Sequence, residues 1–460
     1  MLVFAAVCGA HAQAPAATPP VPTAQSPGTS SRNANGSLPQ GPGPSTGGIP
    51  GGLGGAASNT APRLQPGQPL TLDLVVALAG TASPRLLEAA SQTQQIRSGV
   101  RTARAYTNPS VEVFQGRQYA RPIATPGVPG LLQHYAAYQT IEVPSERRAR
   151  IRAAELSAEA SGFGQQGVTL SVVADAEHAF YDSLKRREEI DHAQENLNLV
   201  EDLRRRVQVQ VNVGEVGGLE LTRATAEQAR AQFAVASARL EYQQAIAGLR
   251  AAVAAGPDDS IDPQGTPEPR RTLPPMAELR ERVLSTHPAL RQSQKDTEAA
   301  GAALQRQKLL RIPQPVAFAE FENQPDLRFW RTGVTVPLPL FDRRQGPIAD
   351  ATATLARTDA VTRQRRLELT AALERAYEQY QLADEQVGSL EGGQLRAAER
   401  AVEGAQAAYR FGERGIVEVL DAQRVLQTVR GDLLDARFAR QSALVDLEEL
   451  GAVSPLGARP

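Results

Sequence analysis

The sequence predicts a mainly helical protein with a small β part, built from two copies of one structural unit. Residues 213–221 (VGEVGGLEL) are answered 198 positions later by residues 411–419 (FGERGIVEV), and Pro84 is answered by Pro288 at an offset of 204. A repeat of this length indicates a duplicated domain rather than a short solenoid unit. Aromatic residues make up only 5% of the chain, which favours thin seams between helices over a thick globular core.

The offset between the two copies drifts, because residues 179–180 are answered by residues 376–377 at 197. Small loop insertions in one copy would explain this drift. Two stretches rich in Pro and Gly flank the first copy, and such composition is typical of tethers and linkers. The expected division is a signal peptide remnant at 1–12, a disordered tether at 13–69, a first repeat at 70–256, a linker at 257–275, a second repeat at 276–452 and a tail at 453–460.

Residues 1–12 resemble the end of a secretory signal peptide. An apolar run at 2–7 precedes Ala10, His11 and Ala12, a small-x-small cleavage pattern, although no basic segment comes before it. A stray apolar terminus is the alternative. The one cysteine, Cys8, would be removed by such cleavage, so the sequence predicts neither a disulfide framework nor a thiolate metal site.

Each half is expected to contain a helical segment, two strands, a long helix, a Gly-containing turn and a second helix. A capping box formed by Asp342 and Gln345 is expected to open the long helix of the second half. The predicted helices cover 70–104, 146–211 and 219–254 in the first half, and 276–311, 343–409 and 416–450 in the second.

The strand candidates alternate apolar and polar residues and have about the length that spans a bilayer in a β-barrel. They cover 111–115, 138–143, 316–322 and 329–336, and their aromatic residues Tyr135, Tyr138, Phe329 and Trp330 suit a bilayer–water boundary. A soluble hairpin cap would show a similar pattern. No apolar run of about 20 residues follows the N-terminus, so a membrane crossing would require a closed barrel. Four strands leave open edges, whereas three copies would supply twelve strands.

The last helix carries a heptad pattern, which predicts coiled-coil packing. A soluble antiparallel bundle is the alternative. One row contains Val419, Leu426, Leu433 and Leu447, interrupted by Arg440, and the other contains Ala422, Val429, Ala436, Ala443 and Leu450. The corresponding rows of the first half are Leu221, Gln228, Val235, Tyr242 and Leu249, and Ala224, Ala231, Ala238, Ala245 and Ala252.

Residues 409–423 (YRFGERGIVEVLDAQ) closely resemble the second helix-turn of the TolC-like outer-membrane efflux channels, and the likeness in element order covers about residues 70–452. The resemblance implies a homotrimer whose strands form a 12-stranded barrel in outer-membrane lipid and whose helices form a tunnel through the periplasm. It also implies a periplasmic adaptor protein and an inner-membrane pump of the resistance–nodulation–division type as partners. Residues 337–346 (PLPLFDRRQG) resemble the heavy-metal (CzcC-like) branch, which predicts metal cations as cargo.

Two alternatives remain beside this hypothesis. A channel for drugs or for type I secretion of a polypeptide would share the same architecture. A soluble periplasmic coiled-coil adaptor or scaffold belongs to a different class, but adaptors usually combine one helical hairpin with a lipoyl-like β module, whereas this chain shows two hairpins.

The resemblance also assigns a periplasmic aperture. It maps Glu418 and Asp421 onto acidic residues that narrow the mouth, where a trimer would place six carboxylates around one axis. Helix-start acids favoured by the macrodipole are the alternative. It maps Tyr409 and Arg414 onto residues that tie neighbouring helices. In the first half Glu220 matches Glu418, but Arg223 replaces Asp421, and the tip turns contain Gly214, Gly217, Gly412 and Gly415.

The remaining chemistry predicts no enzyme, cofactor or metal site. The net charge of −1 gives no basic face for nucleic acid. The chain contains neither a phosphate-binding loop nor an HExxH motif. The five histidines are scattered, and His178 and His192 lie fourteen residues apart, too far to share one ion. We expect the histidines to be solvated helix residues.

Overall fold

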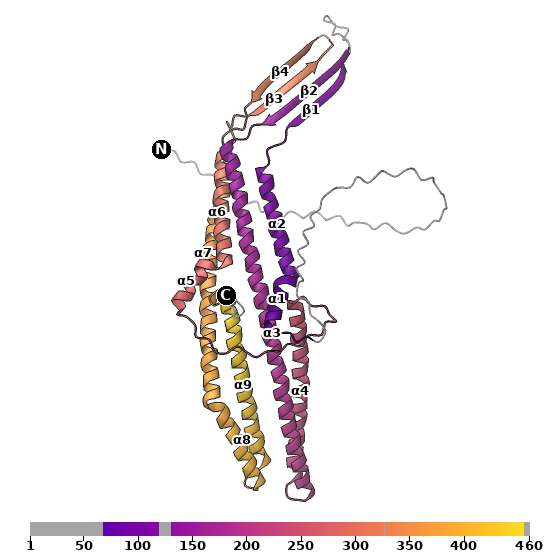
Figure 1. The fold of residues 1–460 in the computed structure, drawn as a ribbon, viewed down its shortest axis with the longest axis vertical. Coiled ribbons are helices and arrows are strands. Elements are labelled where there is room, and N and C mark those ends of the chain that lie inside the picture. The colour runs from indigo at the N-terminus through magenta and orange to yellow at the C-terminus, as the bar shows by residue number, and fades with distance from the viewer. Residues whose placement is uncertain (1–67, 119–129, 326, 455–460) are drawn as a thin grey trace, which may run out of the picture. The chain divides into compact units, whose positions relative to one another are not determined.

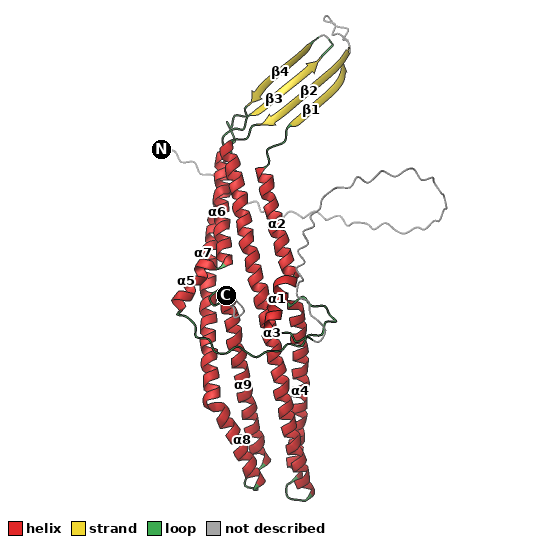
Figure 2. Ribbon diagram, viewed as in Figure 1, coloured by secondary structure: helices red, strands yellow, loops and turns green. Residues whose placement is uncertain are grey.

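The computed structural model describes residues 68–118, 130–325 and 327–454, which belong to one compact unit, Thr60–Pro460. The expected signal remnant and nearly all of the expected tether lie outside the described residues. Within them the fold is mainly helical with one four-stranded antiparallel sheet, as predicted (Figure 2).

The element order of the first half is repeated in the second (Figure 1). The first half contains α1 (Leu72–Ala82), α2 (Pro84–Arg104), β1 (Ser110–Gln118), β2 (Gly130–Thr140), α3 (Pro144–Asn212) and α4 (Gly218–Ala252). The second contains α5 (Met276–Thr286), α6 (Pro288–Leu309), β3 (Val316–Asn323), β4 (Arg328–Thr335), α7 (Gln345–Ser389), a π-helical turn (Leu390–Gln394), α8 (Leu395–Arg410) and α9 (Ile416–Glu449).

The first helical segment of each half is broken, contrary to the prediction of one continuous helix. Ser83 and His287 have extended backbones, and Pro84 and Pro288 then open α2 and α6. A residue before proline is disfavoured in the helical region, and proline suits the first turn, which explains both breaks. The Nδ1 atom of His287 accepts a hydrogen bond from the amide of Ala289 at 3.2 Å, capping α6.

The sheet joins the two halves, because β2 of the first pairs with β3 of the second in the order β1-β2-β3-β4. The predicted strand over 138–143 has the wrong bounds, because β2 begins at Gly130 and ends at Thr140. Its register with β1 runs from Gln118↔Gly130 to Ser110↔Tyr138. Pro109, which has no amide hydrogen, precedes β1 and ends this ladder.

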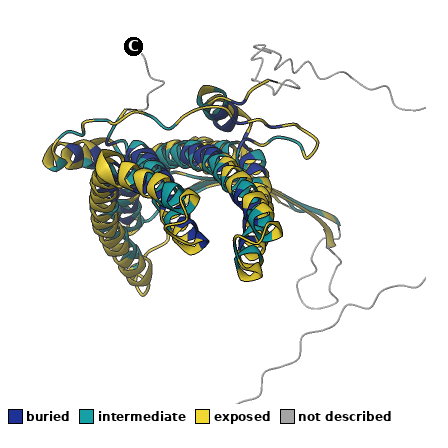
Figure 3. Ribbon diagram, turned by 90° about the horizontal axis from the view of Figure 1, so that it is seen from below, coloured by how far each residue is buried: buried dark blue, intermediate teal, exposed yellow. Residues whose placement is uncertain are grey.

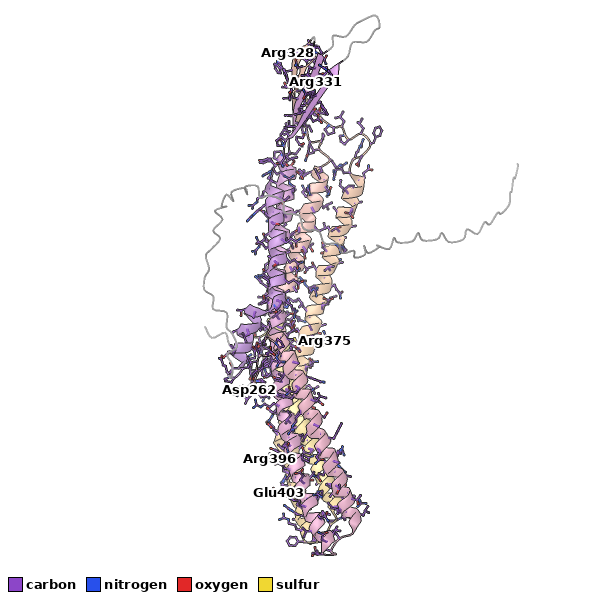
Figure 4. The ribbon with its side chains drawn as sticks, turned by 90° about the vertical axis from the view of Figure 1, so that its right-hand side faces the viewer. Asp262, Arg328, Arg331, Arg375, Arg396 and Glu403 are labelled. Atoms are coloured by element: carbon purple, nitrogen blue, oxygen red, sulfur yellow. The ribbon has the colours of Figure 1, made fainter. Side chains whose placement is uncertain are left out.

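The register separates the side chains onto two faces of the sheet. Val113, Tyr135, Phe321 and Trp330 are cross-strand partners on one face. Glu112, Ala136, Glu320 and Arg331 are partners on the other. Arg331, which is labelled in Figure 4, forms an ion pair with Glu320, whose other oxygen accepts a hydrogen bond from Tyr138 at 3.2 Å. The first face carries large exposed apolar residues, whereas the second carries the ion pair together with aromatic residues such as Phe114 and Phe318. Of the four aromatic residues expected at a bilayer boundary, Tyr135 and Trp330 lie on the first face, and Tyr138 and Phe329 lie on the second.

The predicted heptad seams are buried. The helix α3 is one helix of 69 residues, about 100 Å at the usual rise per residue, and α4 packs along it. The helix α9 packs against α7, α8 and α3. Buried residues lie on the parts of the helix ribbons that face neighbouring helices, and exposed residues lie on the outer parts (Figure 3). Buried seam residues include Val419, Leu426, Leu433 and Leu447 in α9 and Ala224, Ala231, Val235, Ala238, Ala245 and Leu249 in α4.

The long helix predicted over 343–409 is interrupted by the π turn at Leu390–Gln394. This turn lies between the landmarks whose offsets are 197 and 198, so it contains the one extra residue of the second half. A π turn absorbs one added residue inside a helix without rotating the flanking segments. The insertion therefore lies within a helix and not in a loop, and seam residues remain inward on both sides of it, such as Val387 and Ala398.

The predicted capping box is absent at the start of α7. The Asp342 carboxylate accepts a hydrogen bond from the Arg344 amide at 2.7 Å, two residues on rather than three. Arg344 has a left-handed backbone with φ 58°, and the helix begins at Gln345. Asp342 therefore stabilises a turn that precedes the helix.

Residues 256–275, named here the linker strap, are ordered against the helices. Arg187 of α3 donates to the Pro263 carbonyl at 3.0 Å and contacts Asp262 at 2.9 Å (Figure 4 labels Asp262). The amide of Leu70 donates to the Asp262 carbonyl at 2.9 Å. None of the described helices carries an apolar stretch of the length and hydropathy that a bilayer crossing requires.

Candidate functional site

The two helical hairpins end in turns with the same backbone geometry. Gly214 and Gly412 have φ values of +81° and +71°, which favour glycine strongly. The amide of Glu215 donates to the Gln210 carbonyl and the amide of Glu413 donates to the Ala408 carbonyl, both at 2.9 Å. This bond across five residues is the Schellman closure of a helix end. The two turns that correspond in the sequence therefore end their helices with the same type of C-cap.

The other two tip glycines have a different role. Gly217 and Gly415 are the N-caps of α4 and α9, with φ values of −75° and −80°. Residues other than glycine can adopt these backbone conformations. A Cβ atom added at Gly217 would meet nothing within 4 Å, and one added at Gly415 would meet only Glu418 Oε2 at 3.5 Å.

The two predicted aperture acids lie at the start of α9 with different partners. Glu418 is half exposed, and its Oε1 atom is 4.0 Å from Nη1 of Arg414. Asp421 is more exposed and accepts a hydrogen bond from Arg424 at 2.8 Å. Both carboxylates therefore lie at the tip surface beside a cation of their own segment, and one turn of helix separates them.

Arg424 joins the two hairpins, a role that sequence reasoning missed. Its second guanidinium nitrogen is 3.0 Å from Oε2 of Glu227 on α4, whose side chain is only 16% exposed. The spacing of three between Asp421 and Arg424 could have suggested a local pair. Nothing local in the sequence indicates Glu227, which is 197 positions away.

Tyr409 also connects the hairpins. Its hydroxyl donates a hydrogen bond to Oε1 of Gln210 on α3. Burial, and secondarily the negative charge of Glu220, raise the pKa of Tyr409, so the phenol remains a donor across the physiological range. The ring packs against a buried cluster that combines residues of both hairpins: Leu203, Val207, Ala224, Ile416, Val419 and Leu420.

Arg414 and Arg223 contact their own helices or turns. Among ion pairs of the described residues, Arg414 has only the 4.0 Å contact with Glu418, and its side chain is 67% exposed. Arg223, which replaces Asp421 in the first half, lies 3.6 Å from Glu220. The structure thus brings Tyr409 to the neighbouring hairpin and leaves Arg414 at the tip surface.

The expectation of solvated histidines is wrong for His178. Its Nε2 atom lies 3.0 Å from Asp446 Oδ1 and its Nδ1 atom 3.2 Å from Ser442 Oγ, so it joins α3 to α9. The hydrogen bond with Asp446 raises the pKa of His178 despite partial burial. Across the described ranges, His, Cys, Asp and Glu side chains do not gather in groups of three that could hold a metal ion.

A cavity of about 1040 Å³ lies between α2, α3, α6 and α7, in the parts of these helices that are nearest to the sheet. Its charged lining residues are Glu142, Arg150, Asp296, Arg306 and Arg357. Glu142 is almost fully buried, contacts Arg150 at 2.8 Å and accepts a hydrogen bond from the Thr107 hydroxyl at 2.9 Å. These bonds favour the charged carboxylate and lower the pKa of Glu142, although its burial opposes them.

The duplicated hairpins, the joining sheet and the matched tip turns define a class of proteins. The model of the family described as outer membrane efflux protein matches residues 75–255 and 279–452, one match in each half, and the chain belongs to this family. Members of the family are trimeric channels that work with a periplasmic adaptor and an inner-membrane pump, and they are passive conduits rather than enzymes. The chain is accordingly the outer-membrane channel component of an efflux system.

Among its relatives is the cobalt-zinc-cadmium resistance protein CzcC of Cupriavidus metallidurans. The two are 26% identical over 369 residues, which cover 79% of this chain and 85% of the relative. The fold is similar to that of CusC, with a TM-score of 0.72 at 18% identity over 82% of this chain and 91% of that one. The outer membrane protein VceC of Vibrio cholerae gives 0.72 at 17% identity over 83% and 96%.

Proposed function

We propose that this chain forms a homotrimeric outer-membrane channel through which heavy-metal cations leave the cell. A periplasmic adaptor and an inner-membrane pump of the resistance–nodulation–division type would deliver them. The observation that carries this proposal is the sheet, which exposes large apolar residues and whose two outer strands each pair on one side only among the described residues.

The apolar face of the sheet suits contact with lipid. Val111 and Val113 are strongly exposed on β1, as is Trp330 on β4, and Tyr135 and Phe321 lie between them on the same face. Large exposed apolar residues on one face, with aromatic residues among them, are typical of the outer surface of a membrane barrel. The opposite face, which carries Glu112, Glu320 and Arg331 beside aromatic residues such as Phe114, would then face the lumen.

The free edges of the sheet favour three copies. Among the described residues, β1 pairs only with β2, and β4 pairs only with β3. Unpaired edge groups in hydrocarbon cost several kcal/mol each, so the β1 edge of one copy would pair with the β4 edge of the next. Three copies of four strands close a barrel of twelve. The cavity lined by Arg150, Asp296 and Arg357 would then face a continuous helical tunnel.

The oligomeric state tests the barrel. In mild detergent, light scattering on the purified chain should give the mass of a trimer, three times the mass of the chain, which is 49.1 kDa for these 460 residues. A water-soluble monomer that keeps its structure without detergent would contradict the barrel.

The cargo is inferred from the named relative, a cobalt-zinc-cadmium resistance protein. Cells that lack this chain should be more sensitive to cobalt, zinc or cadmium salts, and expression of the parent chain should restore resistance. Unchanged metal sensitivity together with increased drug sensitivity would instead support the drug-efflux alternative. If cells that lack this chain keep their metal resistance but no longer export a polypeptide, the type I secretion alternative would be supported. The soluble adaptor is excluded by family membership.

A further inference from the structure

The linker strap crosses three helices and binds each of them through different groups. The Glu268 amide donates to Gln441 Oε1 of α9 at 2.9 Å, and the Arg271 amide donates to the Tyr380 hydroxyl of α7 at 2.8 Å. Gly265 lies against the Phe180 ring of α3, where an added Cβ atom would be 3.2 Å from Cζ. The strap therefore connects α3 of the first half with α7 and α9 of the second half.

Three carboxyl groups lie on the segments that the strap joins. Glu177 precedes Phe180, which contacts Gly265, by one turn of α3, and Glu448 follows Gln441, which binds Glu268, by two turns of α9. Glu177 of α3 is 7% exposed. Glu268 of the strap has a buried Oε2 atom without a hydrogen-bond partner. Glu448 of α9 contacts Arg271 Nη1 at 2.8 Å, and its side chain is 10% exposed. The Glu268 carboxyl group thus has a buried oxygen atom without the partner that a buried charge requires.

The nearby cations do not balance these carboxylates. Arg271 is bound to Glu448, whereas Arg270 and Arg440 both contact Asp384 of α7, at 2.9 and 3.3 Å. His178 of α3 is directed to Asp446. Three carboxyl groups therefore share one guanidinium. The charged and titratable groups around residues 268–271 of the strap include Glu177, His178 and Tyr181 of α3, Tyr380 and Asp384 of α7, Arg440, Asp446, Glu448 and Glu449 of α9, and Glu268, Arg270 and Arg271 of the strap. Arg187 of α3 and Asp262 form an ion pair at its other end.

We propose that Glu177, Glu268 and Glu448 form a proton-binding cluster that keeps the linker strap closed on α3 and α9, and that the strap loosens when the cluster loses its protons. A neutral carboxyl group needs no counter-charge, and two neutral groups can share a hydrogen bond. Three carboxylates beside one guanidinium repel one another in a poorly solvated space.

The raised pKa values of the three carboxyl groups agree with this geometry. Burial, with the neighbouring carboxyl groups second, raises the pKa values of Glu177 and Glu448 to about 7 each. Burial also raises the pKa of Glu268. A carboxyl group whose pKa is higher in the closed state than in water stabilises that state at low pH. This stabilisation is complete below the ordinary carboxyl pKa and is lost as the pH rises through about 7.

Hydrogen–deuterium exchange of the strap amides tests the proposal in the intact, detergent-solubilised protein. The observable is the protection of the peptide containing the Glu268 and Arg271 amides, corrected for the intrinsic pH dependence of exchange. For each carboxyl group with a closed-state pKa near 7, protection should fall about tenfold between pH 6 and pH 8. The combined Glu177→Gln, Glu448→Gln variant should remain protected at both pH values.

Two variants separate the cluster from its surroundings. Asp262→Asn removes the ion pair with Arg187 at the other end of the strap, so it should lower protection equally at both pH values. His178→Gln removes the neighbouring imidazole, whose pKa is raised by its hydrogen bond with Asp446, and the pH dependence should persist in this variant. If the double variant is poorly folded by circular dichroism, Glu177→Gln alone should reduce the pH dependence by about half on a logarithmic scale. Equal protection of the parent at pH 6 and pH 8, or an unchanged pH dependence in the Gln variants, would overturn the proposal.

Discussion

Tyr409 of α8 donates a hydrogen bond to Gln210 of α3, although 199 positions separate the two residues in the chain. The bond lies beside the Schellman turns of both hairpins, and the Tyr409 ring packs against the apolar cluster that the hairpins share. The two tips are therefore fixed to each other within one chain. If the tips form the periplasmic mouth, contacts of this kind determine how far the mouth can open.

Removing the Tyr409 hydroxyl should favour the open mouth. Tyr409→Phe keeps the ring and its packing but loses a hydrogen bond, which is typically worth about 1 kcal/mol, or roughly a fivefold shift in the equilibrium. We expect a higher mean conductance in planar bilayers. Tyr377→Phe is a suitable control, because that half-buried ring lies near α5 and away from the tip. Equal conductance of Tyr409→Phe and parent channels would show that this bond does not restrain the mouth.

The ion pair between Arg424 and Glu227 should contribute separately. The guanidinium is about half exposed and the carboxylate is largely buried, so we expect a coupling free energy of about 0.5–1 kcal/mol. A double-mutant cycle with Arg424→Gln and Glu227→Gln, read as the open fraction of single channels, measures it. Additive effects of the two substitutions would mean that the pair does not hold the hairpins together.

The four tip glycines should respond differently to alanine. Gly412→Ala places a Cβ atom on a backbone with φ +71°, at a cost of about 1–2 kcal/mol. Gly415→Ala replaces a residue with φ −80° and should be nearly neutral. Thermal unfolding of the two variants compares them directly. Similar destabilisation by both would contradict the assignment of the left-handed position as the one that requires glycine.

The repeat in the sequence was sufficient to predict the element order, the tip turns and the buried seams. It also contained the change of offset from 197 to 198, but only the structure shows that a π turn accommodates the added residue. The strand β2 was displaced because its paired length depends on Pro109 and β1, not on its own alternation. Contacts such as Arg424 with Glu227 depend on how two hairpins lie side by side, which local patterns do not encode.

The pair of His178 with Asp446 should stabilise the protein more at low pH. The pKa of His178 is raised in the folded state, so its contribution is complete below the ordinary histidine pKa and is lost as the pH rises through the folded value. The loss of melting temperature caused by His178→Gln should therefore be larger at pH 6 than at pH 8.5. Equal losses at both pH values would contradict a charged pair in the folded state.

The same substitution separates a structural role from metal binding. Because His178 contacts Asp446 and Ser442 rather than a group of metal ligands, a folded His178→Gln, His192→Gln variant should support the same resistance to metal salts as the parent. Loss of resistance with normal abundance in the membrane would show that these histidines act on the cargo.

Single-channel recording of the aperture acids tests the central claim most directly. In a trimer, Glu418 and Asp421 would place six carboxylates around the mouth, so the parent should form channels that prefer cations and are blocked by divalent cations. The Glu418→Ala, Asp421→Ala variant should lose much of that preference and block. Glu278→Ala, Glu281→Ala, which removes two acids from α5, should not. Absence of channels from the parent would contradict the conduit, and identical cation preference and block in the parent and the Glu418→Ala, Asp421→Ala variant would contradict the acidic mouth.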